Sequence, residues 1–221
     1  MNEFFITATD TDAGKTYVAR ALVTALVNQG KHVAVYKPVS AGCELINGEL
    51  VNEDACLLQA SGNCRQSLTQ INPIAFAEPI APHIAAEKLQ QHISVSQIMA
   101  GYEQVKALGA DVVVTEGAGG WRLPLGQGAY LSEFAKQAGV GVILVVNMKL
   151  GCLNHAMLTY EAIIADGLPC VGWVANCQQQ MPYLEENIAE LRRLLPMALM
   201  ARLDYCADIN KAAALFDVQL N

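Results

Sequence analysis

Short apolar runs alternate along the chain with stretches in which apolar residues recur at helical spacing. The short runs are rich in β-branched residues and predict strands; they are Phe4–Thr7, His32–Tyr36, Asp111–Thr115, Val140–Val146 and Cys170–Ala175. The longer stretches predict helices at about Thr16–Asn28, Ser94–Leu108, Ser132–Ala138, Asn154–Ala165 and Tyr183–Leu194. The pattern therefore predicts a chain in which strands and helices alternate.

The predicted strands are apolar on both faces. This pattern is typical of a parallel sheet that is covered by helices on each side. Alternating strands and helices also favour right-handed crossovers within one α/β domain, which we expect to span residues 1–221. The least regular part, residues 61–93, contains Pro73, Pro79 and Pro82 and is interpreted as an excursion on the substrate side, not as a second domain.

Composition and charge exclude several classes of protein. Hydrophobic residues make up 53% of the 221 residues, which excludes a disordered chain. The formal charge is −7 and no basic run is present, so we expect no binding to nucleic acid. No segment approaches the ~20 apolar residues of a membrane span, and the N-terminus has no signal-peptide pattern, so we expect no membrane association and a cytoplasmic location. The 7 cysteines form no CxxC pair, which favours reduced, inert thiols.

The first predicted strand leads directly into Ala8-Thr-Asp-Thr-Asp-Ala-Gly-Lys-Thr16. A strand, a loop that ends in Gly-Lys-Thr and a helix together form the context of a P-loop. Gly14 would let the backbone approach a phosphate, Lys15 would add a charge, and Thr16 would offer a hydroxyl to Mg²⁺. The fold prediction is therefore a P-loop NTPase-like α/β domain, and an ordinary turn between strand and helix is the alternative.

Charged residues gather at the predicted carboxyl ends of strands, where open α/β sheets bind ligands. Asp10 lies in the phosphate loop, Glu116 follows a strand directly, and Asp54 lies at the apparent start of a helix. Acidic residues here suggest bound Mg²⁺. Lys37 ends the second strand, and we expect its side chain in a solvent-filled cleft, next to an anion.

Each of these charged residues has a simpler alternative. Asp54 would serve equally as a helix cap. Glu116 would serve as the structural partner of a lysine, and Lys37 as a surface lysine with its amine in water.

The combination of motifs resembles the dethiobiotin synthetase family over most of the chain, from the first strand to about Asn176. The matching segments, in order, are Thr9-Asp-Thr11 with Gly14-Lys-Thr16, Tyr36-Lys-Pro-Val39, Asn52-Glu-Asp54, Phe76-Ala-Glu-Pro79 with Pro82-His83, Glu116-Gly-Ala-Gly-Gly-Trp121, Lys149-Leu-Gly-Cys-Leu-Asn-His-Ala-Met157 and Gly172-Trp-Val-Ala-Asn176. The chain differs from the family's pattern at Ala8, where the family has glycine, in the order of Ser40 and Ala41, and at Ala201–Asp204, where a nucleotide loop is expected.

The resemblance implies a reaction, its partners and its site. The family joins 7,8-diaminononanoate and CO₂ at the expense of ATP, with Mg²⁺, and forms dethiobiotin, ADP and phosphate by way of a carbamate and a carbamic-phosphoric anhydride. It also implies a homodimer with sites at the interface, in which the turn Gly151–Asn154 of one subunit holds the substrate carboxylate of the other. For Asn154 a plain helix cap is the alternative role, and the two roles are compatible.

The resemblance also implies a role for each site residue. The catalytic residues are then Thr11, Lys15 and Lys37. The nucleotide is expected to contact Asp12, Ala13, Gly14, Lys15, Thr16, Tyr17, Glu116 and Asn176, the last through adenine. The substrate is expected to contact Thr11, Lys37, Ser40, Ala41, Gly151, Cys152, Leu153 and Asn154. Mg²⁺ is expected near Asp10, Thr16, Asp54 and Glu116.

Two other functions compete with this one. One is a P-loop ATPase of the partitioning or metal-cluster class, which couples ATP hydrolysis to a conformational change. Such proteins carry a lysine early in the phosphate loop, and residues 8–13 contain none. The other is a regulatory protein with a decayed site, which the retained Lys15, Lys37 and three carboxylates argue against.

Overall fold

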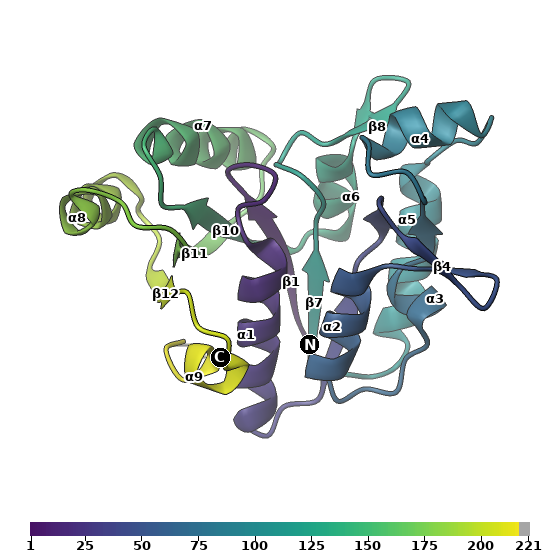
Figure 1. The fold of residues 1–221 in the computed structure, drawn as a ribbon, viewed down its shortest axis with the longest axis horizontal. Helices are drawn as coiled ribbons and strands as arrows, with labels where there is room; N and C mark the ends of the chain where they lie inside the picture. The colour runs from purple at the N-terminus through teal and green to yellow at the C-terminus, as the bar shows by residue number, and fades with distance from the viewer. Residues whose placement is uncertain (217–221) are drawn as a thin grey trace.

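The centre of the fold is a sheet in which every strand runs parallel to its neighbours (Figure 1). The computed structural model describes residues 1–216, and within them six strands form this sheet. In order across the sheet they are β12 (Leu199–Asp204), β11 (Cys170–Cys177), β10 (Gly141–Asn147), β1 (Asn2–Ala8), β7 (Val112–Glu116) and β2 (Val33–Tyr36).

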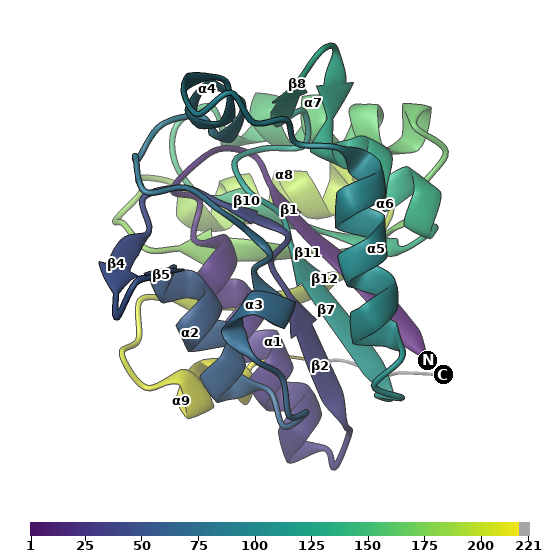
Figure 2. The ribbon, with the colours of Figure 1, turned by 90° about the vertical axis from the view of Figure 1, so that its right-hand side faces the viewer.

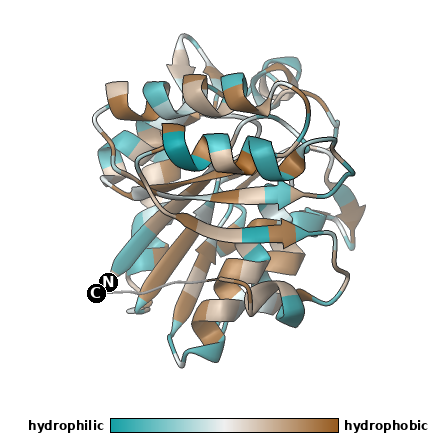
Figure 3. Cartoon of the chain, turned by 90° about the vertical axis from the view of Figure 1, so that its left-hand side faces the viewer, coloured by the Kyte–Doolittle hydropathy of each residue, from teal (hydrophilic) through white to brown (hydrophobic). Residues whose placement is uncertain are grey.

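Helices cover both faces of the sheet (Figures 1 and 2). One face carries α1 (Lys15–Asn28), α2 (Glu53–Ser61) and α9 (Ile209–Ala213), and the other carries α5 (Val95–Lys106), α6 (Leu131–Ala138), α7 (Cys152–Ala165) and α8 (Leu184–Leu194). Side chains of successive strand residues point to opposite faces of the sheet: Ile6 packs toward α1, whereas Phe5 packs toward α5 and α6. The central residues of these strands are therefore mostly apolar (Figure 3), as a sheet covered on both sides requires.

Smaller elements surround the carboxyl end of the sheet. They are β3 (Val39–Ser40) paired with β6 (Ile74–Ala75), the hairpin of β4 (Glu44–Ile46) and β5 (Glu49–Val51), the short helices α3 (Leu68–Ile71) and α4 (Pro82–Lys88), and the hairpin of β8 (Pro124–Gly126) and β9 (Ala129–Tyr130). The irregular stretch 61–93 thus contains α3, β6 and α4, and its residues 79–82 line the cavity described below.

The structure confirms the predicted parallel sheet with helices on both faces. Each predicted strand and helix is present with shifts of a few residues at its ends. The sequence did not predict β12, because Arg202 interrupts its apolar pattern at the sheet edge. The prediction of a nucleotide loop at Ala201–Asp204 is therefore wrong, because these residues belong to the strand β12.

The domain bounds 1–221 remain a prediction, and residues 217–221 lie outside the described part of the chain. Among residues 1–216, no helix has both the length and the apolar character that crossing a membrane requires.

Candidate active site

The phosphate loop connects β1 with α1 at the carboxyl edge of the sheet. Gly14 precedes the helix with φ 80°, a left-handed conformation that glycine adopts at little cost. A Cβ at this position would also lie 2.1 Å from the side-chain nitrogen of Asn176. The backbone conformation therefore favours glycine here, and a larger residue would also displace the Asn176 side chain. Ala8, where the resemblance noted in the sequence implied glycine, is fully buried in the core at the end of β1.

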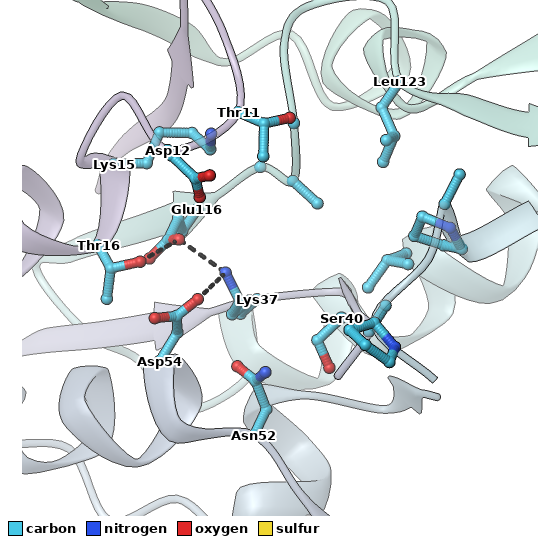
Figure 4. Close-up of a pocket in the computed structure, with 18 of the residues that line it drawn as sticks. Thr11, Asp12, Lys15, Thr16, Lys37, Ser40, Asn52, Asp54, Glu116 and Leu123 are labelled. Carbon is cyan, nitrogen blue, oxygen red and sulfur yellow. Dashed lines mark hydrogen bonds and ion pairs between the residues drawn. The ribbon is translucent and has the colours of Figure 1, made fainter. Parts of the chain in front are cut away.

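A cavity of about 880 Å³ opens beside this loop (Figure 4). Its polar side is formed by Thr11, Asp12, Gly14, Lys15, Thr16, Lys37, Asn52, Asp54 and Glu116, and its more apolar side by Val39, Ala41, Pro79, Ile80, Ala81, Pro82 and Leu123. The phosphate loop thus faces a space that also offers apolar contacts. Such a space suits a small organic molecule next to a phosphate.

Lys37 is the centre of the polar side. Its Nζ lies 2.6 Å from Oε1 of Glu116 and 3.2 Å from Oδ2 of Asp54 (Figure 4). The hydroxyl of Thr16 also donates to Oε1 of Glu116, at 2.8 Å. Lys37 is 4% exposed and Glu116 1%, so one buried ammonium compensates a buried carboxylate and a half-exposed one. Lys37 thus lines the cavity, as expected of a residue in a cleft, but its side chain is more buried than expected because two carboxylates lie against its amine.

The two lysines differ in their electrostatics. Burial lowers the pKa of Lys37, but the negative charges of Glu116 and Asp54 outweigh this effect and hold the pKa above its ordinary value. For Lys15, burial is the largest effect and keeps its pKa below the ordinary value, with only partial compensation from Glu116. Among residues 1–216, Lys15 forms no ion pair and donates to the backbone carbonyl of Asp10 at 3.4 Å, so the phosphate of a nucleotide would supply an anion at this lysine.

The predicted metal residues do not all come together. Thr16, Asp54 and Glu116 converge around Lys37, whereas the carboxylate of Asp10 lies 3.0 Å from Nζ of Lys149. The hydrogen bond from Lys149 is the main reason why the pKa of Asp10 is lowered. Asp10 does not line the cavity, although its backbone carbonyl accepts a hydrogen bond from Lys15 at 3.4 Å. The inclusion of Asp10 among the metal residues stays a prediction.

The oxygen atoms at Thr16, Asp54 and Glu116 fit Mg²⁺. Oε2 of Glu116 is buried and has no hydrogen-bond partner in the described structure. In residues 1–216, no group of three or more His, Cys, Asp or Glu side chains is arranged to hold a metal ion. Mg²⁺ needs no such cage, because it is usually bound through one or two carboxylates, phosphate oxygens and water.

Asn176 contacts the phosphate loop from β11. Its Nδ2 donates to the carbonyl of Ala13 at 2.7 Å, and its Oδ1 accepts from Gln178 at 2.8 Å. Tyr17, on α1, donates to the carbonyl of Asp204 at 3.3 Å. These contacts join the loop and α1 to the far strands β11 and β12. An adenine contact of Asn176 stays a prediction.

The predicted substrate residues fall into two groups. Thr11, Lys37, Ser40 and Ala41 line the cavity. The hydroxyl of Ser40 donates to Oδ1 of Asn72 at 2.7 Å, so it is engaged within the protein. The turn Gly151–Asn154, with Cys152 and Leu153 between its ends, lies at the start of α7 and contributes nothing to the cavity of its own chain.

Sequence reasoning missed Asn72 and assigned no role to Lys149. Asn72 stands in the irregular stretch before Pro73, where no periodic pattern marks its side chain as buried. Lys149 follows β10 at the same edge of the sheet as the phosphate loop. This position after a strand end could have predicted that Lys149 lies near the loop.

Comparison with known proteins gives a consistent assignment. A family model described as "AAA domain" matches residues 2–213. The ATP-dependent dethiobiotin synthetase BioD of Alteromonas mediterranea is 45% identical over 99% of this chain and 99% of its own. The protein of the same name from Aeromonas salmonicida is 47% identical over 93% of this chain and 91% of its own.

A solved structure shows the same kind of fold. The MinC:MinD cell division protein complex of Aquifex aeolicus matches with a TM-score of 0.57 at 14% identity, over 96% of this chain and 86% of that chain. This likeness shows the fold alone, whereas the sequence identities above cover nearly the whole chain. The site at the end of β1, β2 and β7 thus occurs in a chain that belongs to the ATP-dependent dethiobiotin synthetase family.

Proposed function

We propose that this protein uses ATP to join CO₂ to 7,8-diaminononanoate and to close the ring of dethiobiotin, with release of ADP and phosphate. The observation that carries the proposal is the cavity, in which a phosphate loop and the buried amine of Lys37 face a more apolar wall. The relatives at 45% and 47% identity, named for dethiobiotin synthesis, support this reaction over the alternative of a motor-type ATPase.

The chemistry takes three steps. One amine of the substrate attacks the carbon of CO₂ and loses a proton, which gives a carbamate. A carbamate oxygen then attacks the γ-phosphorus of ATP and ADP leaves, which gives a carbamic-phosphoric anhydride. The second amine attacks the carbonyl carbon and loses a proton to solvent, phosphate leaves with the carbamate oxygen, and the cyclic urea closes.

The residues of the chain bind and stabilise charge during these steps. Lys15 and the backbone N–H groups around Gly14 bind the β- and γ-phosphates at the start of α1. Lys37 stabilises the charge that develops between carbamate and phosphate, and Thr11 orients the carbamate from the other side of the cavity. Glu116 and Asp54 hold the Lys37 amine in place, at 2.6 and 3.2 Å.

Mg²⁺ and the nucleotide complete the proposed site. Thr16, Glu116 and Asp54 would hold Mg²⁺, which supplies positive charge to the β- and γ-phosphate oxygens. Asp10 is an additional candidate near the ion. Asp12–Tyr17 surround the phosphates, and Asn176 contacts adenine at the β11 side of the loop.

The protein is proposed to work as a homodimer in the cytoplasm. The turn Gly151–Asn154 opens α7, and the first N–H groups of a helix suit an anion such as the substrate carboxylate. Because this turn does not line its own chain's cavity, it is available to a partner subunit. Leu150, which precedes α7, is 94% exposed and Leu158, on α7, is 59% exposed, so both are available for apolar contact with a partner subunit.

Product analysis tests this function. Purified protein is incubated with ATP, Mg²⁺, the diamine and ¹³C-bicarbonate, and the mixture is analysed by mass spectrometry. We expect dethiobiotin that carries one ¹³C atom in its urea carbon. ATP hydrolysis without a labelled product would reject the proposal.

A further inference from the structure

The backbone of Lys37 lies just beyond the last sheet pair of its strand. β2 pairs with β7 up to Tyr36, which lies opposite Thr115. Lys37 comes next and is followed by Pro38, which has no N–H to donate. The polar backbone groups of Lys37 therefore need partners outside the sheet.

Residues 71–74 supply partners for the backbone of Lys37 and of the following residue, Pro38. The N–H of Lys37 donates to the carbonyl of Ile71 at 2.8 Å, and the N–H of Ile74 donates to the carbonyl of Pro38 at 3.2 Å. The remaining group, the carbonyl of Lys37, accepts from Nδ2 of Asn72 at 2.7 Å. The Asn72 side chain thus supplies the hydrogen-bond partner that the backbone of Lys37 still needs.

The same carboxamide also holds the other end of the segment. Oδ1 of Asn72 accepts from the hydroxyl of Ser40 at 2.7 Å. Asn72 is 8% exposed and does not itself line the cavity. A carboxamide offers a donor and an acceptor at once, which neither a carboxylate nor an alanine does. Asn72 therefore links Lys37 to Ser40 from outside the cavity, away from the reacting groups.

We infer that Asn72 is a positioning residue for the reaction: its carboxamide sets the backbone of Lys37 so that the amine stays between Glu116 and Asp54. This inference rests on the proposed function, in which Lys37 stabilises the transferred charge. It goes beyond that function because Asn72 acts through Lys37 without contact to the substrate. A small displacement of such a group costs up to about a hundredfold in rate.

Gln66 provides a matched control. It is also 8% exposed, and its carboxamide also bridges the backbone of β2, with 2.9 Å from its Oε1 to the N–H of Val35 and 2.9 Å from its Nε2 to the carbonyl of Val35. Val35, however, remains paired with Val114 of β7. Loss of the Gln66 side chain therefore removes two similar hydrogen bonds without releasing Lys37.

The experiment compares Asn72→Ala, Asn72→Asp and Gln66→Ala with the wild type. We expect comparable falls in melting temperature for the two alanine variants. The kcat of dethiobiotin formation should fall by about tenfold or more only in the Asn72 variants, and their KM for ATP should be nearly unchanged. Asn72→Asp keeps the size of the side chain and the acceptor for Ser40 but loses the donor to the Lys37 carbonyl. It therefore replaces the alanine variant in the comparison if that variant does not fold. In a Lys37→Gln background, Asn72→Ala should add no further loss of kcat.

A second readout does not depend on the reaction. The rate at which an amine-reactive reagent modifies Lys37, followed by peptide mass spectrometry, should rise several-fold in the Asn72 variants and stay at the wild-type rate in Gln66→Ala. This result would hold even if the wild type formed no dethiobiotin, so failure of the proposed function is distinguishable from failure of the inference. Unchanged kcat and Lys37 modification in folded Asn72 variants, or equal changes in Gln66→Ala, would overturn it.

Discussion

At Lys37, one buried ammonium group compensates the buried carboxylate of Glu116 and the half-exposed carboxylate of Asp54. Lys37→Gln removes this charge and leaves Glu116 buried next to Asp54 without a cation. We expect kcat to fall by ~10²–10³, the scale of one preorganised electrostatic group. We also expect a loss of stability of up to about 3–5 kcal/mol, because breaking a buried pair leaves an uncompensated charge.

Steady-state kinetics and urea unfolding measure the two effects separately. Adding Glu116→Gln to Lys37→Gln should recover part of the stability and none of the activity, since it removes the unpaired carboxylate. A folded Lys37→Gln protein with wild-type kcat would exclude Lys37 from the mechanism.

Gly14 and Gly30 allow a matched test of the phosphate loop. Both have left-handed backbones, with φ 80° and 81°, but only at Gly14 would a Cβ meet a neighbour within 4 Å, the Asn176 side chain. Both alanine variants should therefore lose about 1 kcal/mol of stability from backbone strain. Gly14→Ala alone should weaken ATP binding, by roughly tenfold or more, because its methyl displaces the contact between Asn176 and the loop.

Isothermal titration calorimetry with ATP and Mg²⁺ provides the affinities. Equal affinity in the two variants would show that the close approach of Gly14 to Asn176 has no part in nucleotide binding.

At the scale of elements, the sequence predicted the strands and helices that have a regular apolar pattern, and it missed an irregular edge strand and the contacts between distant segments. The strands of the sheet interior were predictable because both of their faces are buried, so each is a continuous apolar run. The edge strand β12 contains Arg202 and lacks this run. The phosphate loop and the carboxylates at strand ends followed from motif and topology. The pairing of Asp10 with Lys149, or of Asn72 with Lys37, depends on contacts between distant segments that no local pattern records.

Asp166 joins three elements and provides a pH-dependent test of their docking. At the end of α7, its Oδ2 accepts from Nε1 of Trp121 at 2.9 Å and pairs with Arg122, while its Oδ1 pairs with Lys136 of α6. Burial raises the pKa of Asp166, but the hydrogen bonds from Arg122, Trp121 and Lys136 outweigh it and lower the pKa. The stabilisation is therefore present above the unfolded pKa near 3.9 and is lost as the pH falls through the lower folded value.

Asp166→Asn should consequently lower the free energy of unfolding by about 1–2 kcal/mol at pH 7, with a difference that shrinks below pH ~4. Urea unfolding, followed by tryptophan fluorescence between pH 3 and 7, measures this difference. A difference that stays constant over this range would show that the Asp166 charge does not stabilise the docking.

At the scale of the whole molecule, one chain presents a cavity without the turn that should bind the substrate carboxylate. If a partner supplies Gly151–Asn154, then Asn154→Ala and Lys15→Ala should each be nearly inactive alone. After subunit exchange in an equal mixture, activity should return to about a quarter of the wild type, because half of the dimers are hybrids and each hybrid holds one intact site. No recovery despite exchange confirmed by mass spectrometry would mean that the turn serves its own subunit.

In the proposed reaction, the cavity couples ATP cleavage to carboxylation of a diamine. The most direct measurement is the rate of ADP release with both 7,8-diaminononanoate and bicarbonate, with each alone, and with neither. We predict rapid release only when both are present, with one dethiobiotin formed per ADP, because the carbamate is the group that receives the phosphoryl. Equal ADP release in the absence of the diamine would contradict this coupling and would indicate an ATPase that acts independently of the carboxylation.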